Sequence, residues 1–223
     1  MPAAQTQALS QDKPLRQEKQ RQKKLLVATA NAHKLQEIRD IFATCGMNHW
    51  LLIGLDHYPH YVPPLENGAT FAENALIKAT AAARMSGLLT LADDSGLMVD
   101  ALAGAPGVHS ARYAADWGAD HDDAANRKKL LAALAQTADE QRGAAFICAA
   151  ALATPAAETA SVEGRCEGRI IREERGEGGF GYDSLFFLPG LGQTMAELSA
   201  AVKNELSHRG QAMRQIAALL TRA

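Results

Sequence analysis

Hydrophobic positions along the chain fall into short continuous runs that alternate with stretches of helical spacing. Each continuous run is short enough for a buried strand, and they occur at residues 24–30, 49–55, 88–92, 144–154 and 184–190. Helical spacing predicts helices over residues 33–44, 122–136, 194–201 and 207–221. Thr70 and Glu73 match a capping box, which predicts an Ala-rich helix from there to about Ser86.

The order of these elements predicts the fold class. Strands and helices alternate in the first half, whereas residues 144–154 and 161–174 read as neighbouring strands of a hairpin or meander. This pattern favours an α/β fold, a mixed sheet flanked by helices. Residues 1–23 are rich in Gln, Lys and Arg and predict a disordered polar tail. The tail could instead make a weak basic contact with nucleic acid or serve in targeting. Residues 24–223 are expected to form a single domain.

The run at residues 88–92 ends in two adjacent carboxylates, Asp93 and Asp94, followed by Ser95 and Gly96. The apolar run and the glycine predict a buried strand that ends in a turn at this point. Open α/β sheets place ligand sites at strand ends. Two neighbouring acids repel each other, so a positive group is expected nearby, and a divalent metal is the usual one. A solvated Asp-Asp turn is the alternative.

Composition and charge narrow the classes of protein that remain. Hydrophobic residues make up 47% of 223 residues, enough for a core, and the net charge of −2 disfavours duplex nucleic acid as a stable partner. No apolar run approaches a membrane span, and the N-terminus lacks the apolar core of a secretory signal. Cys45, Cys148 and Cys166 form no CxxC pair. These features together favour a reduced, cytoplasmic protein.

Two segments could contribute to an anion and metal site. The turn from Thr29 to Lys34 joins a predicted strand to a helix, where free N–H groups and the helix dipole favour phosphate. Thr29 and Asn31 can add hydrogen bonds there, and Lys34 a positive charge. Alternatively, Asn31 is only a helix N-cap and Lys34 a solvated lysine. Glu66, in a Pro-rich loop, matters only if that loop folds over the two aspartates.

Glycines at positions 176, 178 and 181 formally match the GxGxxG dinucleotide fingerprint. That fingerprint requires a helix directly after it, whereas the residues that follow, YDSLFFLPG, favour β structure. We therefore expect a loop whose backbone approaches a flat ligand, with Phe180 or Tyr182 beside it. A plain glycine-rich hairpin is the alternative.

Near the C-terminus, Ser207 is the expected N-cap of the last helix. His208 and Arg209 then lie in the first helical turn, where the helix dipole disfavours cations. An anionic or polar partner is therefore expected for them, although a solvent-facing pair is the alternative. Lys203 lies one turn earlier.

Taken together, five segments resemble the Ham1-like inosine triphosphate pyrophosphatases, enzymes that remove non-canonical purine nucleotides. The resemblance covers about residues 25–220 and rests on VATANAHKLQEI, ENGATFAENALIKA, LADDSGLMVDALAGAPGVHSARYA, GGFGYDSLF and KNELSHRGQAM. It implies an elongated α/β fold with a cleft between two lobes, and a homodimer. It also implies Mg²⁺-dependent hydrolysis of ITP, dITP and XTP to the monophosphate and pyrophosphate.

The resemblance also implies roles for particular positions. Asp94 would be the general base and, with Glu66, a metal ligand. Asp93 would be a supporting acid, because neighbouring side chains on a strand point to opposite faces. The substrate-binding positions would be Thr29, Ala30, Asn31, Ala32, His33, Lys34, Ser95, Phe180, Gly181, Tyr182, Asp183, Lys203, His208 and Arg209. Among these, Thr29, Asn31, Lys34 and Lys203 would contact the triphosphate. Ser95, the segment from Phe180 to Asp183, His208 and Arg209 would lie at the nucleoside end. Relatives often have Gly at the position of Ala30, a change that removes no ligand.

Overall fold

The computed structural model describes residues 22–222. The predicted tail therefore lies, apart from its last two residues, outside the described part of the chain. The first strand begins at Lys23, one residue before the predicted start of the domain. No helix among the described residues is long and apolar enough to cross a membrane.

Within residues 22–222, seven strands form one mixed sheet in the order β2-β1-β3-β4-β5-β6-β7. β1 is parallel to β2 and to β3, and every later pair is antiparallel. The mixed sheet predicted from the sequence is thereby confirmed. The strands are β1 (Lys23–Val27), β2 (Trp50–Gly54), β3 (Thr90–Val99), β4 (Gly143–Ala153), β5 (Thr159–Ile170), β6 (Phe186–Leu188) and β7 (Gln193–Thr194).

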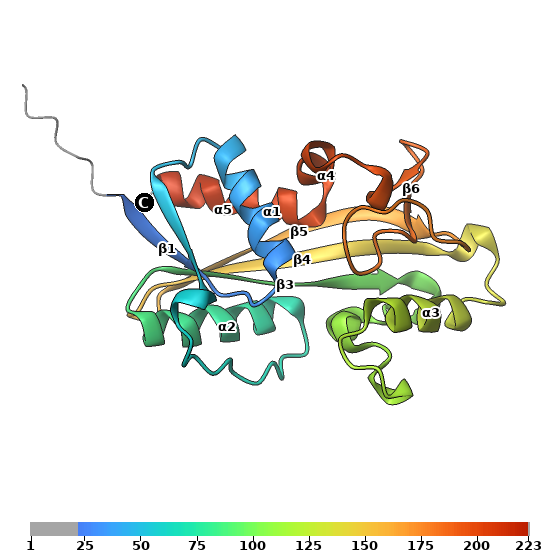
Figure 1. Ribbon diagram of the computed structural model, residues 1–223, viewed down its shortest axis with the longest axis horizontal. Coiled ribbons are helices and arrows are strands. Elements are labelled where there is room, and N and C mark those ends of the chain that lie inside the picture. The colour runs from blue at the N-terminus through green and yellow to red at the C-terminus, as the bar shows by residue number, and fades with distance from the viewer. Residues whose placement is uncertain (1–21, 223) are drawn as a thin grey trace, which may run out of the picture.

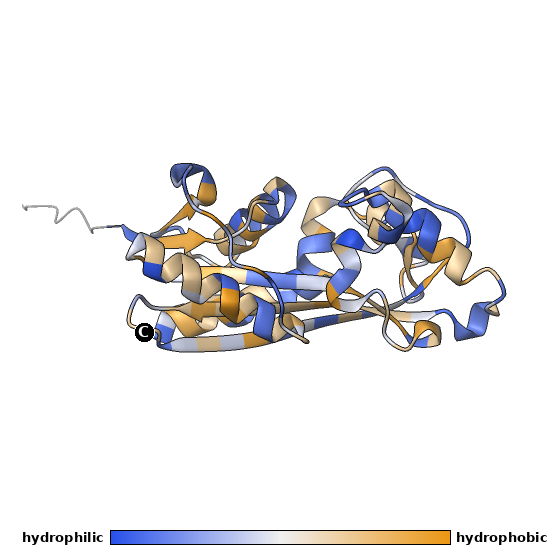
Figure 2. Ribbon diagram, turned by 90° about the horizontal axis from the view of Figure 1, so that it is seen from below, coloured by the Kyte–Doolittle hydropathy of each residue, from blue (hydrophilic) through white to orange (hydrophobic). Residues whose placement is uncertain are grey.

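Helices cover both faces of this sheet (Figure 1). In that view α1 (Ala32–Thr44), α4 (Ala200–Leu206) and α5 (His208–Arg222) lie above the sheet. Below it lie α2 (Phe71–Ser86) and α3 (Asp123–Ala133). The helices carry both hydrophilic and hydrophobic residues, as expected for elements with one side on a core (Figure 2).

The long strands β3, β4 and β5 run along the molecule and join two groups of elements at its ends (Figure 1). At one end, Leu25 and Val27 pack with α1 and α5, while Leu26 and Ala28 pack with α2 on the opposite face. At the other end a third cluster gathers Leu97, the α3 leucines and the residues around Phe186. Because successive side chains of β1 point to opposite faces of the sheet, this strand contributes residues to both core layers.

The packing of α2 against β4 depends on small residues. α2 buries Ala75, Ala79, Ala82 and Ala83, and β4 presents a row of alanines to the same cluster. Ala leaves room for the helix backbone to approach the sheet closely, and it costs no side-chain entropy on burial. The helix begins as predicted, with the reciprocal hydrogen bonds of a capping box between Thr70 and Glu73.

The strand predicted over residues 24–30 ends at Val27 and the helix predicted over 122–136 ends at Ala133, but three other predicted elements are wrong in ways that matter more, and the largest error concerns the aspartates. β3 does not end before Asp93 but continues to Val99, because it stays paired with β4 over its whole length. Gly96 is not a turn residue; a Cβ there would clash with Ser110 Oγ, so glycine allows close packing. What ends near the aspartates is the neighbour β1, whose pairing with β3 stops at Leu91.

The other two errors lie in the C-terminal half. The expected strand over residues 161–174 is β5, which starts and ends earlier. Residues 194–201 do not form one helix, because a capping box between Thr194 and Glu197 closes only a single 3₁₀ turn at Met195–Glu197. A second N-cap at Ser199 then starts α4.

All three cysteines are free, and they differ in access to solvent. Cys148 and Cys166 are buried, and desolvation raises the pKa of each thiol to about 11, whereas Cys45 is partly exposed. The thiolate is the reactive form. We expect one fast-reacting thiol per chain with Ellman's reagent at pH 8, and three after denaturation. In Cys45→Ser the fast phase should vanish; a fast phase that persists would contradict this assignment.

Candidate active site

A cavity of about 540 Å³ opens beside the free edge of β3 beyond Leu91, where β1 no longer covers it. Segments far apart in the sequence line this cavity. They are the β1–α1 turn, the loop before α2, the middle of β3, the start of α3, the loop at 180–183 and the start of α5. All the predicted site residues except Ala32 lie on its wall, including Ala30 and Asn31. Ala32 is the exposed first residue of α1.

Asp93 points from β3 toward α1 and α5 and is fully buried. One of its oxygens lies 3.0 Å from Lys34 Nζ and 3.3 Å from Arg209 Nη2, and accepts a hydrogen bond of 2.7 Å from Ser95. Burial alone would raise the pKa of the carboxyl group, but Lys34 and Arg209 outweigh it and hold that pKa far below its usual value. Asp93 is therefore a permanent anion that fixes two cations.

Asp94 points to the opposite face, toward α2. Its oxygens accept hydrogen bonds from Asn74 Nδ2 at 3.2 Å and from Lys78 Nζ at 2.9 Å. The same ammonium group lies 3.0 Å from Glu66 Oε2, so the loop before α2 does fold over the aspartates. Burial raises the pKa of Asp94 above its ordinary value despite the lysine. This carboxylate is therefore a better proton acceptor than a solvated one.

Lys78 is the most important residue that the sequence reasoning missed. Burial by itself disfavours its ammonium group, but Asp94, Asp93 and Glu66 raise its pKa above the usual value. It is one helical turn beyond Asn74, so both side chains lie on the same side of α2. Two polar residues four apart beside a buried alanine face were the available signal in the sequence.

Phe180 lies half-buried at the other end of the cavity, with Lys203 and Arg209 near its ring. Lys203 Nζ is 4.9 Å and Arg209 Cζ is 5.7 Å from the ring centroid, and the His33 ring is stacked on it at 5.5 Å. Tyr182, the other aromatic candidate, is buried and donates a hydrogen bond to the Ser110 carbonyl. Phe180 is therefore the aromatic side chain placed to contact a flat ligand.

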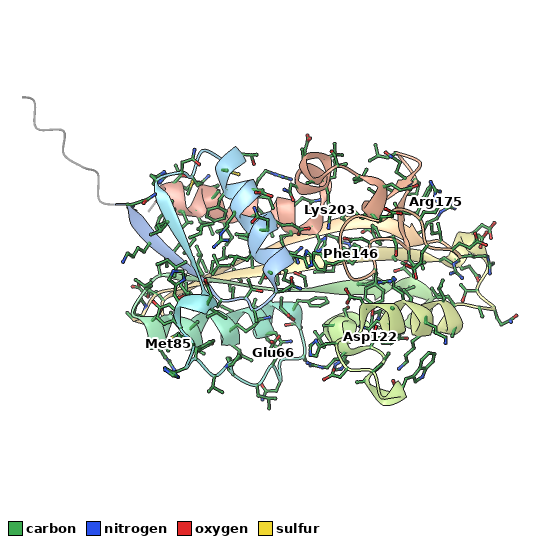
Figure 3. All side chains as sticks on the ribbon, viewed as in Figure 1. Glu66, Met85, Asp122, Phe146, Arg175 and Lys203 are labelled. Atoms are coloured by element: carbon green, nitrogen blue, oxygen red, sulfur yellow. The ribbon has the colours of Figure 1, made fainter. Side chains whose placement is uncertain are left out.

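Asp183 connects this end of the cavity to α4. Its Oδ2 accepts hydrogen bonds from Lys203 Nζ at 2.7 Å and from the Phe180 N–H at 2.9 Å. Burial raises the pKa of Asp183, and Lys203 only partly opposes this. Lys203 also lies 2.7 Å from Glu37, a residue of α1 that the sequence analysis did not single out. Both Lys203 and Glu66 line the cavity, and Figure 3 shows Lys203 above the sheet and Glu66 below it.

The first turn of α5 carries a charged residue, Arg209, and a neutral one, His208. Arg209 is buried and pairs with Glu37 and Asp93, so the anionic partner predicted for it is present. His208 is stacked on Phe146 at 4.8 Å. Burial and the nearby Arg209 lower the pKa of His208 well below its usual value, so the ring is neutral at pH 7. Ser207 accepts a hydrogen bond from the Gly210 N–H, as an N-cap does.

For the turn from Thr29 to Lys34, the structure confirms that Asn31 is a helix N-cap, whereas the alternative of a solvated Lys34 is wrong. Asn31 is the N-cap of α1 and accepts a hydrogen bond from the Lys34 N–H, while its own N–H donates to Thr29 Oγ1. Lys34, however, is not a solvated lysine, since it is paired with Asp93 and its side chain is 16% exposed. The turn thus presents a helix N-terminus and a fixed ammonium group to the cavity.

The loop at 176–183 is not a dinucleotide fingerprint, because no helix follows it. Gly176, Gly179 and Gly181 have positive φ values of 84°, 74° and 63°. At Gly179 a Cβ would also clash with Asp183 Oδ2. These glycines let the chain turn sharply around the Asp183 carboxylate.

The charges of this site leave room for a cation. Its ion pairs join four basic side chains to five carboxylates: Lys34, Lys78, Lys203 and Arg209, with Glu37, Glu66, Asp93, Asp94 and Asp183. No three His, Cys, Asp or Glu side chains among the described residues form a complete metal cage. Glu66 and Asp94 nevertheless converge on one point, now held by the Lys78 ammonium group. Two carboxylates completed by ligand oxygens suit Mg²⁺.

Fold and site together define an α/β protein with a cleft for a ligand that is anionic at one end and flat at the other. The model of the Ham1 family matches residues 25–219, and the chain belongs to this family. It is 51% identical over 193 residues to a dITP/XTP pyrophosphatase of Streptomyces coelicolor, covering 86% of this chain and 94% of the relative. It is 47% identical over 199 residues to a dITP/XTP pyrophosphatase of Desulforamulus reducens, covering 89% and 96%.

The fold of the family is also seen in solved structures. A HAM1 protein from Coxiella burnetii superimposes with a TM-score of 0.80 at 40% identity, over 90% of this chain and 100% of that one. The resemblance inferred from the five sequence segments is therefore confirmed, as is the fold class.

Proposed function

We propose that this protein hydrolyses the non-canonical purine nucleoside triphosphates dITP, ITP and XTP to the nucleoside monophosphate and pyrophosphate. The observation that carries the proposal is that Glu66, Lys78 and Asp94 converge in the same cavity as Phe180. This combination pairs a site for phosphate chemistry with a surface for a base. Membership of a family whose relatives carry the name dITP/XTP pyrophosphatase supports it.

In this proposal the β1–α1 turn and the buried lysines bind the triphosphate. Lys34 is held in place by Asp93, and Lys203 by Glu37 and Asp183, so neither lysine must be ordered when the substrate binds. Water attacks the α-phosphorus, the bond from that phosphorus to the bridging oxygen breaks, and pyrophosphate leaves. Asp94, whose pKa is raised by burial, accepts the proton of the attacking water.

We propose Mg²⁺ as the metal, with Glu66 and Asp94 as the protein ligands. When bound, it would neutralise charge that develops on the pyrophosphate leaving group. Lys78 would then give up its position between the two carboxylates and remain as a neighbouring positive charge. The remaining metal ligands would be phosphate oxygens and water, as is usual for Mg²⁺.

Selection of the base is assigned to the nucleoside end. Hypoxanthine and xanthine carry a 6-oxo group where adenine has an amino group, so a hydrogen-bond donor in the site favours them. Both terminal nitrogens of Arg209 are already engaged by carboxylates. The Gly210 N–H already donates to Ser207, so the backbone N–H groups of His208 and Arg209, at the start of α5, are better placed to donate. Ser95 and Phe180 complete this end of the cavity.

Incubation with dITP, ITP and XTP in the presence of Mg²⁺, followed by identification of the products, tests the proposal. The expected products are the monophosphate and pyrophosphate, and EDTA should abolish turnover until Mg²⁺ is restored in excess. IDP with orthophosphate would contradict the proposal, and binding without turnover would indicate a nucleotide-binding protein instead. Equal rates on ATP and GTP would indicate a broader phosphatase.

We also infer a homodimer from the resemblance to the family, and a cytoplasmic location from the scattered free cysteines. Sedimentation analysis of the purified chain tests the first, and fractionation of cells that express it tests the second.

A further inference from the structure

The loop that carries Phe180 is held by α3, a helix that carries none of the predicted site residues although Asp123 at its start lines the cavity. The Gly181 N–H donates to Asp123 Oδ2 at 2.8 Å, and the Gly181 carbonyl accepts from Arg127 Nη1 at 2.9 Å. Both side chains come from α3 and are four residues apart, so they project from the same side of that helix. The backbone of Gly181 is thereby held on both sides, at the N–H of the peptide group before it and at the carbonyl of the peptide group after it.

α3 is itself held in place by buried hydrogen bonds. Asn126, between Asp123 and Arg127, is buried; it accepts a hydrogen bond from the Ala114 N–H at 2.7 Å and donates one to the Ala111 carbonyl at 3.1 Å. Arg127 is further oriented by Glu174 at 2.8 Å. Figure 1 shows α3 below the sheet, whereas α4, the other anchor of the loop through Lys203 and Asp183, lies above it.

The Gly181 backbone held by α3 directly follows Phe180, and the orientation of the Phe180 ring decides whether a base can stack on it. On its other side the loop is tied by the Phe180 N–H, which donates to Asp183. Gly181 has φ of 63° and no side chain, so without the α3 contacts this peptide could adopt many conformations. A free peptide would let the Phe180 ring leave the base-stacking geometry.

We propose that Asp123 and Arg127 are positioning residues for base recognition, acting on Phe180 through the Gly181 peptide. This inference rests on the proposed function, because it assigns residues to the nucleoside end of that site. Neither residue contacts the ion pairs of Lys78, Asp94 and Glu66 at the phosphate end. Loss of their contacts with Gly181 should therefore weaken binding of the nucleoside and leave the chemical step in place.

Asp123→Ala and Arg127→Met test the proposal. Each is expected to raise KM for dITP by about 10-fold with kcat changed less than threefold, because a lost ground-state contact appears in KM. Inhibition by IMP should weaken by a similar factor, whereas inhibition by pyrophosphate should stay unchanged. Asp123→Asn keeps an oxygen that can accept from the Gly181 N–H, and it should restore KM to within about twofold of the unaltered enzyme.

Matched controls lie in the same helix. Asp122→Ala removes the N-cap of α3, and Lys128→Ala removes an exposed charge beside Arg127. Neither residue contacts Gly181, so both variants should keep KM even if Asp122→Ala lowers the melting temperature. Figure 3 shows Asp122 at the start of α3.

The outcomes separate this inference from the proposed function. The positioning role is overturned if inhibition by IMP and inhibition by pyrophosphate weaken equally in Asp123→Ala and Arg127→Met. It is also overturned if KM for dITP does not change in these variants. In both cases the turnover of dITP by the unaltered enzyme still supports the proposed function. If the unaltered enzyme does not turn over dITP, the proposed function fails. In that case the affinity of the same variants for IMP, measured by calorimetry, decides whether Asp123 and Arg127 support binding at the nucleoside end. Should Asp123→Ala not fold, Arg127→Met carries the comparison.

Discussion

Replacing Asp94 by asparagine is expected to lower kcat for dITP by ~10³-fold or more, because the change removes the proposed general base and a metal ligand together. Asparagine has nearly the same shape and can still accept the hydrogen bond from Asn74. Lys78 keeps its contact with Glu66. We therefore expect the variant to fold, and steady-state kinetics with a circular dichroism melt measures both effects.

Asp56→Asn is the matched control for this substitution. Asp56 is an exposed carboxylate beside His57 that neither lines the cavity nor takes part in the site ion pairs, so its variant should keep full activity. If Asp94→Asn kept more than about a tenth of the kcat of the unaltered enzyme, Asp94 would not be the general base. A collapse of the melting transition in Asp94→Asn would instead show that the carboxylate is needed for the fold.

The second large effect is expected on stability, in Asp93→Ala. Asp93 has no exposed surface, and its loss leaves Arg209 with Glu37 alone and Lys34 without its partner. Removal of one member of a buried ion pair costs about 3 kcal/mol of unfolding free energy. For a chain of this size that corresponds to a melting temperature lower by about 10 °C. Urea denaturation and a thermal melt measure these two quantities.

Asp139→Ala provides the comparison with an exposed ion pair. Asp139 lies 2.8 Å from Arg172, but 61% of its side chain and 52% of the arginine side chain are exposed. Solvent screening limits such a pair to about 0–1 kcal/mol. If Asp93→Ala costs no more than Asp139→Ala, the buried cluster does not stabilise the fold in the way described.

The two aspartates show how far the sequence could be read. The sequence led us to expect the pair at a ligand site with a positive group near it, and the alternation of a strand implied separate roles for its two members. Lys34 and Arg209 beside Asp93, and Lys78 beside Asp94, agree with that expectation. The strand end itself was misplaced. Local pattern does not show that β4 keeps β3 extended as far as Val99.

Residues that act through other residues were beyond the sequence reasoning. Glu37 and Asp123 carry no local pattern that separates them from surface acids on an ordinary helix. Each gains its role from a partner far along the chain, Glu37 from Arg209 and Asp123 from Gly181. The side that a helix turns to a cavity depends on packing between distant elements, which a single sequence does not specify.

The alternation of strands and helices, the start of α2 and of α5, and the five segments of the Ham1 family can all be recognised in the sequence. Those features depend on neighbours within a few residues, such as caps and hydrophobic spacing. The position of Lys78 between Glu66 and Asp94, and the contacts of α3 with the Gly181 backbone, are seen in the folded structure alone. Ion pairs and backbone contacts between residues tens of positions apart form after the sheet and its helices have packed, so no local pattern encodes them.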